Sequence, residues 1–257
     1  MTYFNWPVIE TTVFAEMPAV LRRPVPTEWS RANKGGAAVD CFLEGPCWDA
    51  AGNLWLVDIP HGRILRVSPQ GDWAAVAEYD GEPNGLALRH DGTLLIADYK
   101  NGLLSLDPAT GVVSPFLTRR NSERFKGPND LVVARNGDVY FTDQGQTGLH
   151  DPTGRVYRLR ADGRLDCLLS NGPSPNGLVL TPDESVLFVA MTRDRSTTNR
   201  GVWGGTKNQR SRSLQRTSLS QRPCTWIIRD PCQKRAQLEP DIFKSRVGVG
   251  ISTSNPS

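Results

Sequence analysis

The sequence predicts an all-β protein of the β-propeller class, because a short phrase recurs along the chain and short apolar runs with turn signals separate its copies. The phrase reads "EPNGLAL" at residues 82–88, "GPNDLVV" at 127–133 and "SPNGLVL" at 174–180. In each copy an Asn follows a Pro, precedes Gly or Asp, and starts an apolar run. Counted from the prolines, with Pro46 heading a first unit, the spacings are 37, 45 and 47 residues. Units of about 40–45 residues that each hold four short strands are typical of propeller blades.

The apolar runs within each unit have the length and composition of antiparallel strands. They are five to seven residues long and rich in Val, Leu, Ile, Tyr and Phe, with "HDG", "RNG", "KNG", "ATG" and "ADG" between them. Asn-Gly and Asp-Gly supply the positive φ angles that tight hairpin turns require. No apolar run keeps the helical period of about 3.6 residues over a helix-length stretch, which excludes a helical repeat. We therefore expect four recognisable blades.

The recurring Asn indicates a site. The first strand of a propeller blade lines the central channel, so the same position in several blades would meet at the channel mouth. Asn84, Asn129 and Asn176 stand at this position, and Glu44 in "LEGP" stands at the matching place of the first unit. Carboxylate and amide oxygens suit a hard cation, whereas a tetrahedral Zn²⁺ site prefers His and Cys. The competing interpretation is that an Asn before Gly only satisfies turn hydrogen bonds.

Four stretches together resemble the senescence-marker-protein-30/gluconolactonase/luciferin-regenerating-enzyme (SMP-30/gluconolactonase/LRE-like) family. They read "FLEGPCWDAAGNLWLVDIPHGRILRV", "GEPNGLALRHDGTLLIADY", "NSERFKGPNDLVVARNGDVYFTD" and "SPNGLVLTPDESVLFVA". The resemblance covers roughly residues 42–194 and implies a six-bladed β-propeller, incomplete in this chain, that hydrolyses lactones. It also implies one divalent metal in the channel, Ca²⁺ first, with Zn²⁺ and Mg²⁺ as alternatives. In the implied mechanism the cation polarises the lactone carbonyl and a carboxylate activates water.

The resemblance assigns roles to five residues of this chain. It implies that Glu44, Asn129 and Asn176 are metal ligands. Asn84 matches a channel position and is expected to contact the substrate. Arg124 lies in the loop before "PND", where family members often place an Arg on the substrate. A solvated loop position is the alternative for this Arg.

One part of the family pattern is missing. The family's fourth ligand and favoured general base is an Asp in a later "PDG" phrase, and no such phrase follows Asp194. Asp130 is the remaining candidate for a catalytic base, although a side chain next to a channel-facing Asn should point elsewhere. His150, in "TGLHDPTGR", is a further candidate for a substrate contact at the channel mouth, with an exposed loop position as the alternative.

Charge divides the chain into two parts. Residues 195–257 contain 12 Lys and Arg against 3 Asp and Glu, whereas residues 1–194 contain 18 against 24. The basic part is rich in Ser, Thr, Arg and Gln and lacks the blade pattern. We therefore expect an N-terminal segment at 1–40, propeller blades at 41–194, and a basic, disordered tail beyond them. RNA binding by the tail is the electrostatic alternative, but no RNA-binding module surrounds it, so nucleic acid is not an expected partner.

The abrupt change after residue 194 indicates that the expected continuation is replaced, as an alternative splice, a retained intron or a frameshift would do. We therefore expect a truncated isoform that lacks about two blades and leaves two sheet edges exposed.

Cysteine usage and hydropathy bear on location. The five cysteines form no CxxC pair, so reduced thiols are expected. The first 30 residues hold no apolar core of signal-peptide length, and no run approaches the about 18 apolar residues of a membrane helix. These observations predict a cytoplasmic protein without a membrane partner, and they leave the oligomeric state open.

Two functions remain open on the sequence. The first is a metal-dependent hydrolase of small-molecule lactones. The second is a non-catalytic propeller fragment that binds Ca²⁺ or a sugar acid, inactive because the last blades and the "PDG" Asp are missing. The chain has no GxSxG, HExxH or phosphate-binding glycine motif, which argues against serine-hydrolase, zinc-protease and nucleotide chemistry.

Overall fold

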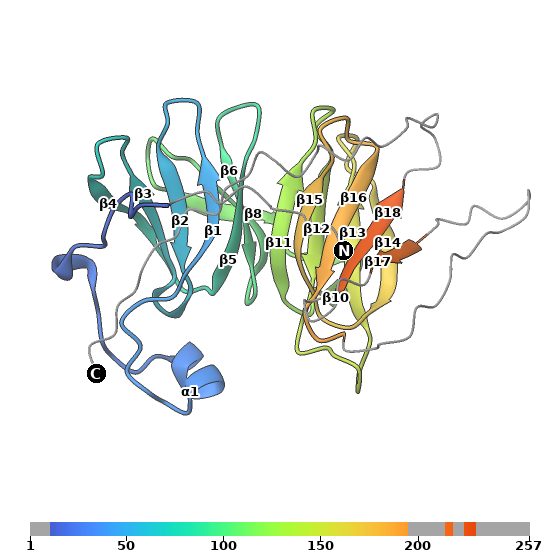
Figure 1. Cartoon of the computed structure of the whole chain (residues 1–257), viewed down its shortest axis with the longest axis horizontal. Coiled ribbons are helices and arrows are strands. Elements are labelled where there is room, and N and C mark those ends of the chain that lie inside the picture. Colours follow the sequence, from blue (N-terminus) through green and yellow to red (C-terminus); the bar gives the residue numbers. More distant parts are fainter. Residues whose placement is uncertain (1–10, 195–213, 218–223, 230–257) are drawn as a thin grey trace, which may run out of the picture.

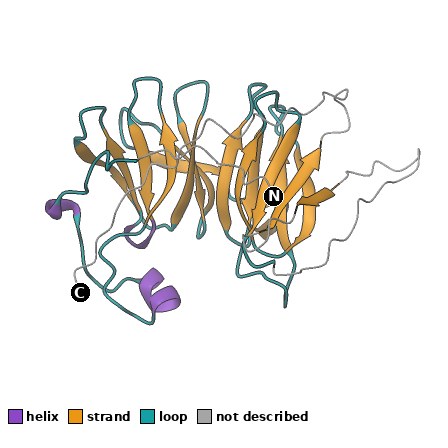
Figure 2. Ribbon diagram, viewed as in Figure 1, coloured by secondary structure: helices purple, strands orange, loops and turns teal. Residues whose placement is uncertain are grey.

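Four antiparallel sheets form the protein. The computed structural model describes residues 11–194, 214–217 and 224–229. Each sheet has four strands, and the sheets stand side by side in chain order as the blades of a propeller (Figure 1). Strands dominate the described residues, and the helical segments lie toward the blade-one end (Figure 2). The predicted all-β propeller class is confirmed, with four blades in the described part of the chain.

In blades one to three, chain order and sheet order agree. Blade one contains β1 (Leu43–Trp48), β2 (Leu54–Asp58), β3 (Arg63–Val67) and β4 (Trp73–Glu78). Blade two contains β5 (Pro83–Leu88), β6 (Leu94–Asp98), β7 (Gly102–Leu106) and β8 (Val113–Leu117). Blade three contains β11 (Pro128–Val133), β12 (Val139–Asp143), β13 (Gly154–Leu159) and β14 (Leu165–Gly172). A small ladder of β9 (Arg119–Arg120) and β10 (Glu123–Arg124) joins blades two and three.

Blade four is ordered differently. Its strands β15 (Pro175–Leu180) and β16 (Val186–Met191) are followed in the sheet by β18 (Cys224–Arg229) and then β17 (Leu214–Thr217). The sequence alone predicts that the blades end at residue 194. Blade four also contains two strands that lie beyond this residue. The segment "CTWIIR" is rich in residues that favour strands, a signal that the basic, Ser-rich surroundings obscured. The remainder of the predicted tail lies outside the described residues.

A short helix precedes blade one. Helix α1 (Glu28–Lys34) begins with a capping box, in which Thr27 Oγ1 accepts from the Ser30 N–H and Ser30 Oγ accepts from the Thr27 N–H. Trp29 on this helix packs against the blade-one core and against the ring of Phe42, 5.3 Å away. Two one-turn 3₁₀ helices complete the set, η1 (Ala19–Leu21) and η2 (Ile59–His61). None of the helices in the described residues is both long and apolar enough to cross a bilayer.

The hydrophobic core lies between neighbouring blades. Apolar side chains from facing sheets form one cluster between blades one and two, one between two and three, and one between three and four. Representative fully or nearly fully buried members are Trp55 and Ile96, Leu103 and Phe141, and Val156 and Val189. Burying each such side chain stabilises the fold by about 1.5–3 kcal/mol. Each blade thus depends on its neighbours, and the inner strands are held in fixed relation to one another.

Buried aspartates hold the start of the inner strand in blades one to three. Asp58, Asp98 and Asp143 end the second strands of blades one to three, and all three are fully buried. Each carboxylate accepts the N–H of the residue just before the inner strand, at 2.8 Å from Phe42 and from Gly127 in blades one and three. Burial raises the pKa of Asp98 and Asp143, although their hydrogen bonds oppose the rise. The aspartate that ends the second strand of each of these three blades is therefore structural.

Candidate functional site

The strand register brings the four predicted residues to one level. Glu44, Asn84, Asn129 and Asn176 are each the second residue of an inner strand, directly after the residue that pairs with the end of the second strand. Inner strands of successive blades lie beside one another, β1 by β5, β5 by β11, and β11 by β15. We call these four residues the inner-strand cluster.

The register also corrects the sequence alignment of the first unit. Leu43, not Pro46, occupies the position of the prolines that start the other inner strands. Pro46 lies three residues further on, inside the irregular pairing between Glu44 and Cys47. A proline cannot donate a ladder hydrogen bond, and a bulge is one of the places where a strand tolerates a proline. All four inner strands carry such an irregularity at or just after the cluster residue, and bulges re-aim side chains.

The glycines of the phrase allow the inner strands to approach closely. A Cβ on Gly45 would lie 2.8 Å from the carbonyl oxygen of Asn84, and a Cβ on Gly85 would lie 2.8 Å from that of Asn129. Gly85 has no positive φ, so a left-handed backbone conformation is not the reason for glycine there. The space between neighbouring strands is the reason, and it brings the cluster residues of blades one to three together.

Hydrogen bonds orient the central amide. Asn129 is 7% exposed, and its Nδ2 donates to Asn84 Oδ1 at 3.1 Å and to Gln144 Oε1 at 3.0 Å. Gln144 in turn donates from Nε2 to Ser174 Oγ at 2.8 Å. With both Nδ2 hydrogens engaged, the Oδ1 of Asn129 remains available as an acceptor. The sequence analysis missed Gln144 and Ser174, whose signals were their places directly after β12 and directly before Pro175.

Asp130 takes a structural position. Its Oδ1 accepts the N–H of Leu131 at 2.9 Å, and its Oδ2 accepts the N–H of Leu178 at 3.0 Å on the neighbouring inner strand. Burial raises the pKa of Asp130 to about 6, the two N–H groups oppose the rise, and the charge of Glu44 adds to it. A carboxylate with both oxygens on backbone amides ties β11 to β15, which disfavours its predicted use as a base.

The donor set suits a hard cation better than zinc. The Glu44 residue is exposed by surface area. The atoms packed around its carboxyl group nevertheless raise its pKa by desolvation, and a hydrogen bond from the Gly45 backbone opposes this rise. Asn176 is half-buried, and among the described residues its side chain has no hydrogen-bond partner. No three His, Cys, Asp or Glu side chains gather in the described part of the chain. One carboxylate with amide oxygens matches Ca²⁺ or Mg²⁺ preference.

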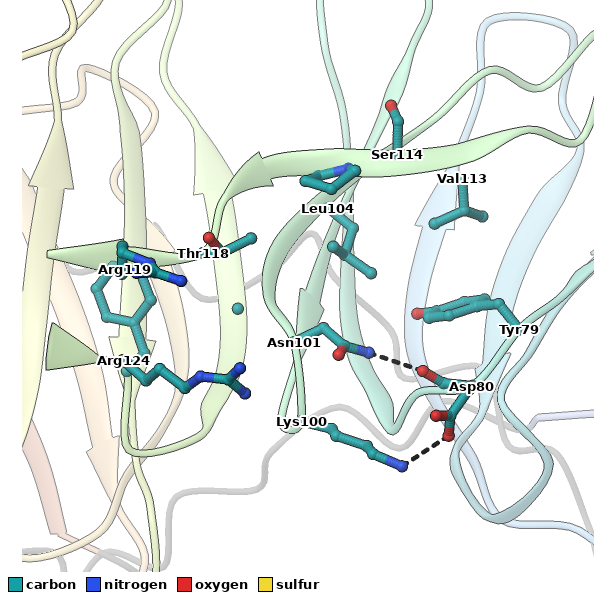
Figure 3. Close-up of a pocket in the computed structure, with 13 residues that line it drawn as sticks. Tyr79, Asp80, Lys100, Asn101, Leu104, Val113, Ser114, Thr118, Arg119 and Arg124 are labelled. Carbon is teal, nitrogen blue, oxygen red and sulfur yellow. Dashed lines mark hydrogen bonds and ion pairs between the residues drawn. The ribbon is translucent and has the colours of Figure 1, made fainter. Parts of the chain in front are cut away.

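Within the described residues, neither Arg124 nor His150 makes a hydrogen bond to the inner-strand cluster. Arg124 lies on β10 and lines a cleft of about 380 Å³ over blade two, which contains none of the four cluster residues (Figure 3). His150 is exposed in the connection between β12 and β13, within the turn closed by a bridge from Gly148 to Asp151. The exposed position of His150 agrees with the loop alternative, whereas Arg124 stands in the β9–β10 ladder.

Comparison with known proteins identifies the family. The SMP-30/gluconolactonase/LRE-like region matches residues 42–216, more than half of the chain. The chain belongs to the SMP-30/gluconolactonase/LRE-like family. The matched region reaches into β17, in agreement with a fourth blade that extends past residue 194.

Individual relatives in the family include lactonases. A gluconolactonase from Zymomonas mobilis is 34% identical over 185 residues, covering 63% of this chain and 51% of its own length. Lactonase drp35 from Staphylococcus aureus is 28% identical, with 64% and 51% coverage. This chain thus spans about half the length of both relatives. A solved gluconolactonase structure from Xanthomonas campestris matches with a TM-score of 0.54 at 26% identity, over 73% of this chain and 68% of that one.

Proposed function

We propose that this protein is a metal-dependent hydrolase of small lactones, with the inner-strand cluster as its site. The observation that carries the proposal is the common register of Glu44, Asn84, Asn129 and Asn176 on four adjacent inner strands. Family membership and the lactonase relatives support the reaction class. The proposed substrate is a small neutral lactone.

In this proposal Glu44, Asn129 and Asn176 hold one divalent cation, with Ca²⁺ favoured over Mg²⁺ and Zn²⁺. The bound ion would supply a Lewis acid that polarises the lactone carbonyl. Asn84 and Gln144 keep the Asn129 amide in one orientation through the hydrogen bonds to its Nδ2. Such fixed donors and acceptors lower the reorganisation cost of reaction.

The step that the inner-strand cluster supports least is the activation of water, because few carboxylates are at hand. Glu44 and Asp130 supply the carboxylates among the second and third residues of the four inner strands, and both oxygens of Asp130 are engaged by N–H groups. This observation favours the second candidate function, a propeller that binds Ca²⁺ or a sugar acid without turnover. The two candidates share the metal site and differ in hydrolysis.

The first test measures hydrolysis of D-glucono-1,5-lactone with added Ca²⁺ and with EDTA. We expect EDTA, Asn129→Ala and Asn176→Ala each to reduce the rate at least about tenfold, since even the loss of a group that only orients a ligand weakens metal binding or activity by about 10–100-fold. Asn33→Ala, an exposed position on α1, is the matched control and should leave the rate unchanged.

Two results would change the conclusion. Hydrolysis that is indifferent to both EDTA and Asn176→Ala would overturn the metal-dependent lactonase. Calorimetric Ca²⁺ binding that Asn129→Ala weakens, without detectable hydrolysis, would establish the non-catalytic binding protein instead.

A further inference from the structure

A second site lies outside the inner-strand cluster, in the cleft over the outer strands of blade two. This blade-two cleft measures about 380 Å³. Its walls come from the end of blade one, from the β6–β7 turn and β8 of blade two, and from the β9–β10 ladder (Figure 3). Its polar lining includes Asn101, Ser114, Thr118, Arg119 and Arg124.

The two arginines form a like-charged pair. Arg119 and Arg124 are directly opposite each other in the β9–β10 ladder. Like charges at directly opposite positions destabilise a strand pair. The chain nevertheless places them there, in a body whose first 194 residues carry more acidic than basic groups. An anion between the two guanidinium groups would remove this repulsion.

The other residues of the ladder already have partners. The guanidinium of Arg120 lies 5.9 Å from the ring centroid of Tyr157, and Glu123 Oε2 is 3.5 Å from Arg155 Nη1. One face of the ladder is therefore attached to blade three. The opposite face presents Arg119 and Arg124 to the cleft, where Figure 3 shows both guanidinium groups extending away from the ladder.

Carboxylates in the described residues do not neutralise this pair. No Asp or Glu of the described part of the chain lies within 4.0 Å of either guanidinium. The one carboxylate of the lining, Asp80, is bound to Lys100 at 2.6 Å, and Lys100 also lies 3.5 Å from Glu28. The cleft thus has two uncompensated positive charges beside a compensated one.

We propose that the blade-two cleft binds small hydroxylated carboxylates, the class of hydroxy acid that lactone opening produces. The planar guanidinium presents donors in a fork that matches an oxyanion such as carboxylate or phosphate. Asn101 donates from Nδ2 to the backbone oxygen of Asp80 at 2.8 Å, so its Oδ1 can accept from a hydroxyl group of such a ligand, and Thr118 adds a hydroxyl to the lining. A lactone is neutral and its product is charged, so the cleft distinguishes product from substrate. The choice of a hydroxy acid, rather than another oxyanion, rests on the proposed lactonase function.

The test is calorimetric titration of the full chain, in EDTA, with D-gluconate, D-glucono-1,5-lactone and inorganic phosphate. We expect gluconate to bind, the neutral lactone to bind at least about tenfold more weakly, and Arg119→Gln and Arg124→Gln each to weaken gluconate binding at least about tenfold. Arg164→Gln, an exposed arginine in the β13–β14 turn, is the control for loss of one positive charge. Thermal melting of each variant confirms that it remains folded.

The location of binding is tested independently of catalysis. Asn129→Ala should leave gluconate binding in EDTA unchanged, because the cleft contains no inner-strand residue. If gluconate binding is lost in Asn129→Ala, or is the same in Arg119→Gln, Arg124→Gln and Arg164→Gln, the proposal is wrong. Phosphate binding as tight as gluconate binding would overturn the hydroxy-acid assignment. These results do not depend on whether the chain hydrolyses lactones.

Discussion

Blades three and four share an inner hairpin and differ in almost everything outside it. Both begin with Pro-Asn, both carry a pairing irregularity that spans the Asn, and both continue into a buried second strand. Blade three then continues as a meander, whereas blade four receives its outer strands in the order β18 then β17. The local phrase is thus sufficient for the inner hairpin, and the outer half of a blade can be built in more than one way.

The start of the inner strand is also held differently. In blade three Asp143 binds the N–H of Gly127 at 2.8 Å. In blade four Met191 stands at the aspartate position, and hydroxyls hold Ser174 instead, through Thr147 Oγ1 at 3.1 Å and Thr192 Oγ1 at 3.0 Å. Neutral hydroxyl groups, rather than a carboxylate, therefore hold the start of the inner strand that carries Asn176. The following variants test whether blade four is the more weakly built of the two.

Core truncation should give the largest difference. Phe141 in β12 is fully buried and stacks on Tyr157 at 5.2 Å, whereas Phe188 in β16, at the register position of Tyr140, is half-buried. Phe141→Ala should reduce the free energy of unfolding by about 3–5 kcal/mol, and Phe188→Ala by less than about 2 kcal/mol. Urea unfolding followed by tryptophan fluorescence measures both. Equal losses would contradict the difference in burial between the two rings.

A charge in the hairpin of blade three should give an intermediate, pH-dependent effect. Burial by itself raises the pKa of Asp138, but the N–H of Ala161 and the guanidinium of Arg158 outweigh it and lower the pKa. The charged carboxylate of Asp138 therefore contributes its full stabilisation above its unfolded pKa of about 4. This stabilisation is lost as the pH falls through the lower pKa of the folded state. Asp138→Asn should cost about 1.5–3 kcal/mol at neutral pH, from loss of charged hydrogen bonds.

Unfolding of this variant and the native chain at pH 7 and pH 3 measures the effect. The difference in the free energy of unfolding should narrow at the lower pH. Asp183→Asn in the exposed hairpin of blade four is the comparison, with a smaller effect expected because water screens the carboxylate. A difference for Asp138→Asn that stays constant with pH would contradict the interpretation.

The glycines of the phrase should give the smallest single loss of stability. A Cβ at Gly85 meets backbone at 2.8 Å, whereas the nearest atom to a Cβ at Gly177 is Asp130 Oδ2 at 3.7 Å. Gly85→Ala should cost about 1–3 kcal/mol through overpacking. Gly177→Ala should be neutral or stabilising by up to about 1 kcal/mol, because alanine restricts the unfolded chain. Thermal melting decides between them, and similar effects would refute the close approach of β5 and β11.

The inner half of each blade was predictable because its signals are local. The Pro-Asn phrase, the Asp-Gly and Asn-Gly turns, and the alternation of short runs act within about ten residues of one another. Gly92 and Gly137, in "HDG" and "RNG", adopt the expected left-handed φ of +85° and +83°. The shared register of the inner-strand cluster follows from the same repetition, since identical hairpins present the same position in each blade.

Contacts between blades were not predictable in this way. Gln144 reaches Asn129 and Ser174 only because β12, β11 and β15 lie side by side. Arg124 was expected near the channel from its distance to "PND", but the ladder with Arg119 directs it to the blade-two cleft. Asp130 lies next to a candidate ligand in sequence, yet its carboxylate binds the neighbouring strand.

The sequence by itself determined the blade class, the inner hairpins and the family, because each depends on residues close together in the chain. Tertiary structure alone decided which side chains meet. Leu43 rather than Pro46 heads β1, β18 rather than β17 adjoins β16, and two arginines on one short ladder face a cleft that no motif marks. Such choices depend on the close approach of backbones and on unpaired charge, and these quantities exist only once distant strands are packed together.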